Sequence, residues 1–349
     1  MTKRVRVLVA DDSMTIRESF ARWIRADRTL ELVGQACDGQ EAVDLALELR
    51  PDVITMDAQM PRKDGFDAIT EIMSRAPSRI LAVCAVSADD SANLSMRAMQ
   101  AGALELIAKP RTPSESTSFG DRLLRAIRLM AEIPVITQRK KGDLRPPAHV
   151  SGRSIDAIGL AASTGGPPAL TSLLGTLPAS FPAPILIAQH MAVGFGAGLA
   201  RWLQQCTSLK VVVARNGEPV APGRVYVPLD GCDIEMGARG VLSVRASSGG
   251  HCPNADRLFS SLARACGARA CGVVLTGMGE DGARGLLEIR RAGGPTFAQN
   301  EATCVVFGMP EAAVRLGAAE NLVPLGELGR LLRELCTPSN SDKTSGAKR

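Results

Sequence analysis

The chain has 349 residues, 45% of them hydrophobic and 22% charged, so it is long enough for two globular domains of ordinary size. The formal net charge is only +5, and no run of Lys and Arg is longer than Arg139–Lys141, so the composition indicates no nucleic-acid surface. The nine cysteines include no Cys-x-x-Cys pair, which argues against a zinc site and a disulfide framework.

No export signal is predicted at the N-terminal residues. Basic residues there precede an apolar run, Val7–Ala10, that stops at Asp11, which is too short for the apolar region of a signal peptide. No run of about 20 apolar residues occurs further on, so no membrane span is predicted. An odd number of unpaired cysteines suits a reducing compartment. We therefore expect a cytoplasmic protein, monomeric and without direct membrane insertion.

Residues 4–132 alternate short apolar runs with amphipathic segments, which predicts five strands and five helices. The strands are expected at Arg4–Ala10, Leu30–Ala36, Val53–Met56, Ile80–Val86 and Leu104–Ala108. The helices are expected at Thr15–Arg25, Glu41–Leu49, Phe66–Ser74, Asn93–Gln100 and Leu123–Ala131. Such alternation predicts an α/β fold with a doubly wound parallel sheet, of the flavodoxin-like kind, whose functional crevice lies at the carboxyl ends of the strands.

Acidic side chains gather at that predicted edge. Asp11 and Asp12 follow the first strand, Asp57 the third, Ser87 the fourth and Lys109 the fifth. A single aspartate at a strand end often only caps the next helix. Three carboxylates together would repel one another without a hard cation, and Mg²⁺ binds such oxygen ligands. An aspartate can form an acyl phosphate, to which a lysine offers a point charge. The set therefore predicts a phosphorylation site.

Residues 4–130 resemble a response-regulator receiver domain, which we place at residues 1–132. The Asp-Asp pair, the Asp-x-x-Met-Pro sequence that begins at Asp57 and the Lys-Pro at 109–110 carry the resemblance. It implies phosphorylation of Asp57 by a histidine kinase, with Mg²⁺ held by Asp11, Asp12 and Asp57 and with support from Ser87 and Lys109. Leu106 departs from the family, which commonly has an aromatic residue there.

Residues 133–151 are rich in proline, glycine and basic residues and are predicted to be a linker. The alternation resumes over 152–337 as a second, Rossmann-like domain, and the polar residues 338–349 are expected to be a disordered tail. Strands are predicted at Ile155–Leu160, Pro184–Ala188, Val211–Ala214, Ala270–Leu275 and Pro295–Ala298. Helices are predicted at about 167–175, 197–206, 254–266, 282–292 and 325–335. An insert at 224–245, with apolar runs at Val225–Val227, Ile234–Met236 and Val241–Val244, is predicted to form β-hairpins.

Ser163 lies at a predicted strand–turn–helix corner, before Thr164, two glycines and Pro167. Proline suits the first turn of a helix. Glycine N–H groups and a helix N-terminus beside the serine could stabilise an oxyanion or hold a phosphate. Neither standard motif fits, because a P-loop needs Lys-Ser/Thr after the glycines, and the α/β-hydrolase elbow has glycine where Ala161 stands.

The three histidines of the chain differ in their surroundings. His149 lies in the predicted linker and His251 in a glycine-rich loop, whereas only His190 follows an apolar strand. Asp281 follows another strand and its glycine turn. Ser163, His190 and Asp281 therefore fall at three strand ends of one predicted sheet edge, as a nucleophile, its base and an orienting acid would. Their order in the chain is no objection, since such triads are defined by geometry.

Residues 152–335 resemble the catalytic domain of the chemotaxis protein-glutamate methylesterase (CheB) family. The matching motifs are Ala162–Pro167, Gln189–Met191, Leu275–Gly282, Gln299–Glu301 and Val305–Pro310. The resemblance implies that Ser163 is the nucleophile, His190 the general base and Asp281 the orienting acid, with Thr164 and Met278 at the oxyanion site.

The same resemblance implies the substrate and its control. It implies hydrolysis of glutamate γ-methyl esters on transmembrane chemoreceptors, often with deamidation of receptor glutamines, and no cofactor in the catalytic domain. It also implies that the unphosphorylated receiver covers the catalytic cleft and that phosphorylation relieves the block. Cys304 and Gly196 depart from the family, which usually has serine and threonine there.

Two other interpretations remain open at this level. A receiver could be joined to a DNA-binding domain, but that would need a basic recognition helix, and the second half has glycine-rich strand ends instead. A related methylesterase could act on receptors for surface behaviour or another non-flagellar output, and the sequence does not separate this circuit from chemotaxis.

Overall fold

A computed structural model of the chain describes residues 4–84, 97–98, 101–103, 105–110, 115–132, 154–191, 196–249 and 251–336. The chain divides into two compact units, Met1–Arg139 and Lys140–Arg349. The predicted linker at 133–151, the predicted tail at 338–349 and Ser87 lie outside the described residues. Among the helices that are described, none has both the length and the apolar character needed to cross a bilayer.

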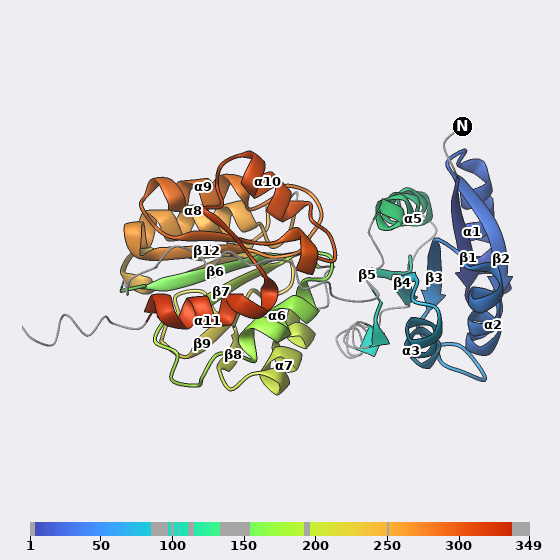
Figure 1. Ribbon diagram of the computed structural model, residues 1–349, viewed down its shortest axis with the longest axis horizontal. Coiled ribbons are helices and arrows are strands. Elements are labelled where there is room, and N and C mark those ends of the chain that lie inside the picture. The colour runs from blue at the N-terminus through green and yellow to red at the C-terminus, as the bar shows by residue number, and fades with distance from the viewer. Residues whose placement is uncertain are drawn as a thin grey trace, which may run out of the picture. The chain divides into compact units, whose positions relative to one another are not determined.

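The first unit contains a parallel sheet of five strands in the order β2-β1-β3-β4-β5, which confirms the predicted fold class (Figure 1). Its strands are β1 (Val5–Ala10), β2 (Leu30–Ala36), β3 (Val53–Asp57), β4 (Arg79–Cys84) and β5 (Glu105–Ala108). Its helices are α1 (Met14–Ala26), α2 (Gly39–Leu49), α3 (Gly65–Arg75) and α5 (Glu115–Glu132). Helices α1 and α5 pack together, as do α2 and α3 (Figure 1). Most of the helix predicted at Asn93–Gln100 lies outside the described residues.

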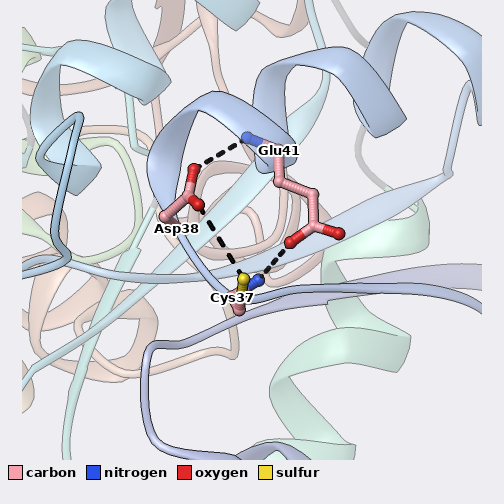
Figure 2. Close-up of side chains that lie close together, drawn as sticks. All are labelled: Cys37, Asp38 and Glu41. Carbon is pink, nitrogen blue, oxygen red and sulfur yellow. Dashed lines mark hydrogen bonds between the residues drawn. The ribbon is translucent and has the colours of Figure 1, made fainter.

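Helix α2 begins at a cluster of Cys37, Asp38 and Glu41 that Figure 2 shows in close-up. The Asp38 carboxylate accepts hydrogen bonds from the N–H groups of Gln40 at 2.8 Å and of Glu41 at 2.9 Å. The Glu41 carboxylate in turn accepts from the Cys37 N–H at 2.7 Å. These bonds satisfy N–H groups that a helix start leaves without partners, so the cluster is explained as a reciprocal helix cap.

The second unit contains a parallel sheet of seven strands in the order β14-β13-β12-β6-β7-β9-β8. The strands are β6 (Ala157–Ala162), β7 (Ile185–Gln189), β8 (Lys210–Val213), β9 (Arg224–Val227), β12 (Ala270–Val274), β13 (Thr296–Gln299) and β14 (Asn321–Val323). The helices are α6 (Gly166–Leu174), α7 (Gly196–Cys206), α8 (Ala255–Cys266), α9 (Ala283–Arg291), α10 (Met309–Arg315) and α11 (Leu325–Cys336). Helices α8, α9 and α10 cover one face of this sheet, and α6, α7 and α11 cover the other (Figure 1).

The prediction of hairpins throughout the insert at 224–245 was wrong for its first run. Val225–Val227 belongs to β9, which lies in the main sheet and pairs parallel with β7 and β8. Tyr226 is fully buried there, and a continuous apolar run is typical of a parallel strand covered on both faces. Only β10 (Cys232–Met236) and β11 (Leu242–Ala246) form the predicted antiparallel hairpin.

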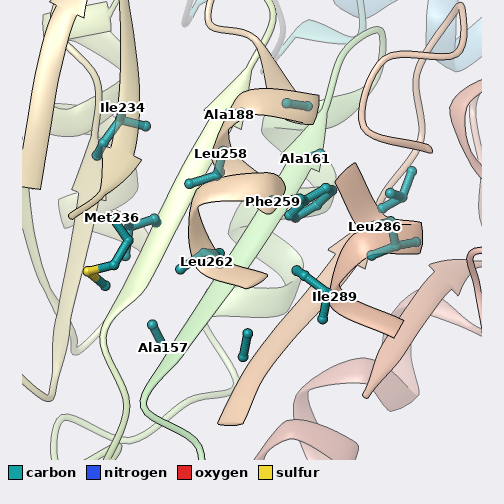
Figure 3. Packing of buried hydrophobic residues seen from close by; sticks show 14 of the residues in the cluster. Ala157, Ala161, Ala188, Ile234, Met236, Leu258, Phe259, Leu262, Leu286 and Ile289 are labelled. Carbon is teal, nitrogen blue, oxygen red and sulfur yellow. The ribbon is translucent and has the colours of Figure 1, made fainter. Parts of the chain in front are cut away.

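The core of the second unit forms where α8 packs against the sheet (Figure 3). The strands contribute small side chains, among them Ala161 of β6 and Ala188 of β7, and the helix contributes Leu258, Phe259 and Leu262. All five are fully buried. Because small strand residues admit the large helix residues, α8 approaches the sheet closely and its first turn is held beside the carboxyl ends of β6 and β12.

Candidate active site

In the first unit, the ends of strands β1, β3 and β5 bring together three of the residues predicted for the acidic pocket. Asp57 ends β3 and is 4% exposed, and Asp11 follows β1 and is 1% exposed. Lys109 follows β5, and its Nζ lies 2.7 Å from Asp57 Oδ2 and 2.7 Å from Asp11 Oδ2. One lysine thus faces two buried carboxylates. Leu106, the departure from the receiver pattern, lies half-buried in β5 against the core.

The electrostatics of this pocket favour a further cation. Burial raises the pKa of Asp57, and the neighbouring Asp11 raises it too, although Lys109 opposes both. Burial alone would lower the pKa of Lys109, but its contacts with Asp57 and Asp11 outweigh burial and raise it. One carboxylate oxygen from each of Asp11, Asp12 and Asp57 lies within 4.8 Å of the others, and Asp12 is exposed. This all-oxygen donor set fits Mg²⁺.

In the second unit the three predicted residues lie at the ends of neighbouring strands, because β6 stands between β12 and β7 in the sheet. Ser163 follows β6, and its N–H donates to the carbonyl of Thr276, beyond β12, at 3.0 Å. His190 follows β7, and its N–H donates to the carbonyl of Ala162 at 2.9 Å. At β6 the chain order along the sheet reverses, which is where ligands bind in open α/β sheets.

His190 and Asp281 are in direct contact, since His190 Nε2 lies 2.7 Å from Asp281 Oδ2. Their side chains are 10% and 4% exposed. The Asp281 carboxylate also accepts from the N–H groups of Ala255 at 2.8 Å and Asp256 at 3.0 Å, in the first turn of α8. Burial would raise the pKa of Asp281, but the hydrogen bonds from His190 and these N–H groups outweigh it, so the pKa is lowered.

The ionised Asp281 decides which nitrogen of His190 carries a proton. A carboxylate can only accept a hydrogen bond, so Nε2 of His190 donates and its Nδ1 keeps a lone pair. Nδ1 is therefore the nitrogen left to accept a proton from a hydroxyl. Within the described part of the chain, the Oγ of Ser163 forms no hydrogen bond, and the residue is half-buried.

The two residues expected at the oxyanion site lie on turns that touch each other. Thr164 is 7% exposed, and its carbonyl accepts from Thr276 Oγ1 at 3.0 Å. Met278 follows Gly277, where an added Cβ would lie 2.8 Å from the Cβ of Ser163, so only glycine allows this approach. The N–H of Met278 finds no acceptor among the residues that the structure describes. Such an N–H can stabilise a developing negative charge.

Three side chains at this site received no role from the sequence, although Gln189 and Thr276 lie within motifs that carry the family resemblance. Gln189 Nε2 donates to the carbonyls of Ser163 and His190, at 2.9 Å each, and ties the two turns together. Thr276 Oγ1 accepts from the N–H groups of Val305 and Val306. The position of Gln189 directly before His190 could have revealed it. The third side chain is His251, which the sequence left without a role and which lies against His190.

Cys304 and Gly196, the departures from the methylesterase pattern, both lie near these turns. Cys304 is 2% exposed, burial raises its thiol pKa to about 12, and its Sγ lies 3.7 Å from the carbonyl of Gln299. A thiol of this kind packs as a small apolar group. Gly196 begins α7, and its N–H donates to the carboxylate of Asp230 at 2.7 Å.

The fold and the two sites define a class of protein: an α/β domain with an acidic strand-end pocket, joined to an α/β domain whose switch point carries a serine beside a histidine–carboxylate pair. Comparison with known families gives the particular family. Residues 158–332 match the CheB methylesterase family and residues 7–118 the response regulator receiver domain. The chain belongs to the CheB methylesterase family of enzymes and carries a receiver domain at its N-terminal side.

Individual relatives agree with this assignment along almost the whole chain. The chain is 51% identical to protein-glutamate methylesterase/protein-glutamine glutaminase 3 of Myxococcus xanthus, covering 95% of this chain and 94% of the relative. It is 43% identical to protein-glutamate methylesterase/protein-glutamine glutaminase 2 of Anaeromyxobacter dehalogenans, covering 95% and 97%. The crystal structure of the Thermotoga maritima CheB methylesterase catalytic domain matches with a TM-score of 0.50 and 33% identity, over 52% of this chain and 99% of that one. The alternative of a DNA-binding second half was therefore wrong.

Proposed function

We propose that the second unit hydrolyses glutamate γ-methyl esters on chemoreceptors and deamidates receptor glutamines, with Ser163 as nucleophile, His190 as general base and Asp281 as orienting acid. The observation that carries this proposal is the 2.7 Å contact of His190 Nε2 with Asp281, at the strand next to the one that presents Ser163. The names of the relatives supply the two substrates, and the site supplies the residues.

The first half of the reaction forms an acyl-enzyme. His190 Nδ1 takes the proton of Ser163 Oγ as the oxygen attacks the ester carbonyl carbon. The carbonyl oxygen becomes an oxyanion, which accepts hydrogen bonds from backbone N–H groups at Thr164 and Met278. When the tetrahedral intermediate collapses, the bond to the methoxy oxygen breaks and His190 gives its proton to that oxygen, so methanol leaves.

The second half regenerates the serine. Water gives a proton to His190 Nδ1 and attacks the acyl carbon, and the collapse of the second intermediate returns the proton to Ser163 Oγ and leaves a free glutamate. With a glutamine substrate the same steps release ammonia in place of methanol. Asp281 keeps Nε2 protonated throughout and stabilises the imidazolium that forms after each proton transfer.

A Ser163→Ala variant tests the nucleophile, and Ser172→Ala is its matched control, because Ser172 is an exposed serine of the neighbouring helix α6. We expect Ser163→Ala to abolish methanol release from methyl-labelled chemoreceptor membranes while thermal unfolding stays close to that of the parent. Ser172→Ala should keep the parent rate. Near-normal turnover by Ser163→Ala would refute the triad.

For the first unit we propose that Asp57 receives a phosphoryl group from a histidine kinase and that this modification raises esterase activity. Asp11, Asp12 and Asp57 would hold Mg²⁺, which supplies positive charge against the phosphoryl oxygens. Lys109 lies close enough to Asp57 to pair with the modified side chain. Ser87 is the further residue proposed to contact the phosphoryl group. In its unmodified state the receiver would block the catalytic cleft.

A further inference from the structure

The imidazole of His251 stacks on the imidazole of His190. The ring centroids are 4.7 Å apart and the ring planes differ by 13°. His251 itself is exposed, whereas the His190 side chain is 10% exposed. The two residues come from different parts of the chain, since His190 follows β7 and His251 lies in the segment between β11 and α8.

The segment that carries His251 is held at both ends. Before it, the N–H of Ser247 donates to the carbonyl of Gly231 at 2.9 Å. After it, Asp233 accepts from the N–H of Asn254 at 2.8 Å and pairs with Arg257 at 2.9 Å. These long-range bonds anchor the segment on the β10–β11 hairpin, so the position of the His251 ring does not depend on its contact with His190 alone.

His251 also adjoins the turn that follows β12. An added Cβ at Gly279 would have His251 Nε2 as its nearest neighbour, at 3.9 Å. This turn carries Met278 on one side and Asp281 on the other. The His251 ring therefore stacks on the face of His190 and lies beside the turn that leads to Asp281.

A stacked imidazole constrains its neighbour in a way that one hydrogen bond does not. The Asp281 contact fixes the position of Nε2, but the terminal torsion of a histidine is broad, so the ring plane can still turn about that contact. A flat ring in parallel contact removes this freedom. The nitrogens of an imidazole donate and accept in the ring plane, so two stacked rings cannot pass a proton directly between them.

We propose that His251 is a positioning residue: its flat ring holds the plane of His190 so that Nδ1 faces the hydroxyl of Ser163. This proposal rests on the hydrolase function proposed above. In this role His251 acts through the flat shape of its ring and takes no part in proton transfer. The residue therefore matters for turnover once substrate is bound, and little for how tightly substrate binds.

Three substitutions in the full-length protein separate these roles. His251→Phe keeps a flat ring and removes both nitrogens, His251→Gln keeps polar groups without a ring, and His251→Ala removes both. We expect His251→Phe to retain kcat within a few-fold. His251→Ala and His251→Gln should lower kcat by on the order of 10- to 100-fold, as expected when a catalytic group is displaced, with KM nearly unchanged. His149→Ala, which replaces a histidine of the predicted linker, is the matched control.

A second readout does not depend on turnover. The chain has only three histidines, so the imidazole resonances of His190 can be assigned by substitution. The ring current of residue 251 should shift them in the parent and in His251→Phe, and the shift should be lost in His251→Ala. Thermal unfolding of each variant tells a positional effect from a general loss of fold.

The outcomes are distinct. If His251→Phe loses as much activity as His251→Ala, a polar role replaces positioning and the proposal is overturned. It is equally overturned if all three variants turn over normally, or if the His190 resonances do not change in His251→Ala. A different result would refute the proposed hydrolase function itself: Ser163→Ala would then retain activity, whatever residue stands at position 251.

Discussion

At the scale of single residues, the fold keeps the carboxylate of Asp281, the proposed orienting acid, ionised by lowering its pKa. Asp281 receives three hydrogen bonds, one from His190 and two from the first turn of α8. The positive end of a helix and its unpaired N–H groups favour an anion. Asp281 thus contacts the histidine with one hydrogen bond and stabilises the start of α8 with the other two, so one side chain serves both the proposed chemistry and the fold.

Replacing Asp281 by asparagine should lower the esterase rate by on the order of 10⁴-fold, because the amide favours the wrong tautomer of His190. Methanol release from labelled receptor membranes measures it. Glu280→Gln is the matched control: Glu280 is an exposed neighbour that pairs only with Arg284 and Arg315 in the described structure. If both variants lose the same activity, the orienting role belongs to neither carboxylate.

The lowered pKa of Asp281 also predicts how stability depends on pH. A carboxyl group whose pKa falls on folding from its ordinary value of 3.8 contributes stability that is complete above that value and is lost as the pH drops through the folded pKa. The second unit should therefore unfold at a lower temperature at about pH 3 than at about pH 5. In Asp281→Asn this difference should shrink. An unchanged difference would mean that other carboxyl groups account for the acid sensitivity.

The pKa of Asp57 is shifted in the opposite direction to that of Asp281, since burial raises it. Its ionised form therefore destabilises the first unit, and Asp57→Asn should raise the unfolding temperature by a few degrees near neutral pH, with Lys109 still paired to Asp11. The gain should vanish below the ordinary pKa of 3.8, where the carboxyl is protonated in both states. Calorimetry measures it, with Asp44→Asn on the exposed side of α2 as control. A destabilised Asp57→Asn would contradict this balance.

At the scale of elements, the active edge of the second sheet is held by the turns after β6, β12 and β13. Thr276 joins them, because its hydroxyl accepts from the N–H groups of Val305 and Val306 and donates to the carbonyl of Thr164. This one hydroxyl therefore joins all three turns through hydrogen bonds. The strands place Ser163, His190 and Asp281 at one edge, and this threonine ties the turns beside them together.

Thr276→Val should cost roughly 1–3 kcal/mol of unfolding free energy for each backbone N–H that it leaves buried without a partner. We also expect a lower esterase kcat, because the Thr164 and Met278 turns would separate. Thr171→Val is the control, since that hydroxyl only bonds to carbonyls of its own helix. Denaturant unfolding and methanol release measure the two effects. A stable but inactive Thr276→Val would mean that the hydroxyl acts in the chemistry itself.

At the scale of the whole molecule, the chain divides into two compact units, so the proposed control by the receiver can be tested by removing the first unit. Phosphorylation of Asp57 would add about one to two negative charges, by analogy with other phosphorylated side chains, and would offer new partners to Ser87 and to Lys109, which already contacts Asp57. A bias of a few kcal/mol between blocked and open states is enough to change activity many-fold.

A fragment of residues 152–337 should hydrolyse labelled receptors without any phosphodonor, at a rate above that of the unphosphorylated full chain. The full chain should accelerate on addition of acetyl phosphate and Mg²⁺, whereas Asp57→Asn should stay at its basal rate. Asp44→Asn is the control that should respond like the parent. Equal rates for the fragment, the unmodified chain and the phosphorylated chain would leave the receiver as a docking module only.

The sequence by itself determined the two folds of parallel sheets and the strand ends at which the candidate site residues lie. Asp11, Asp57, Ser163 and His190 were found because parallel strands end at one edge, so a polar residue directly after an apolar run is placed there by topology alone. Strand β14 was missed because it is only three residues long and half exposed, and its pairing with β13 is not visible locally. The local pattern of apolar and polar residues indicates whether a segment is a helix or a strand, but says little about which other strands it pairs with.

Only the tertiary structure decided the contacts between segments distant in the chain. The place of β9 inside the main sheet depends on its pairing with β7 and β8. The choice of Nε2 of His190 for Asp281, and the stacking of His251 on that ring, depend on where α8 and the β10–β11 hairpin hold their loops. The sequence of a loop has no periodic pattern from which its position in the folded chain could be predicted. The residue types of a site can therefore be found from sequence, whereas the orientation of the catalytic base is a property of the folded chain.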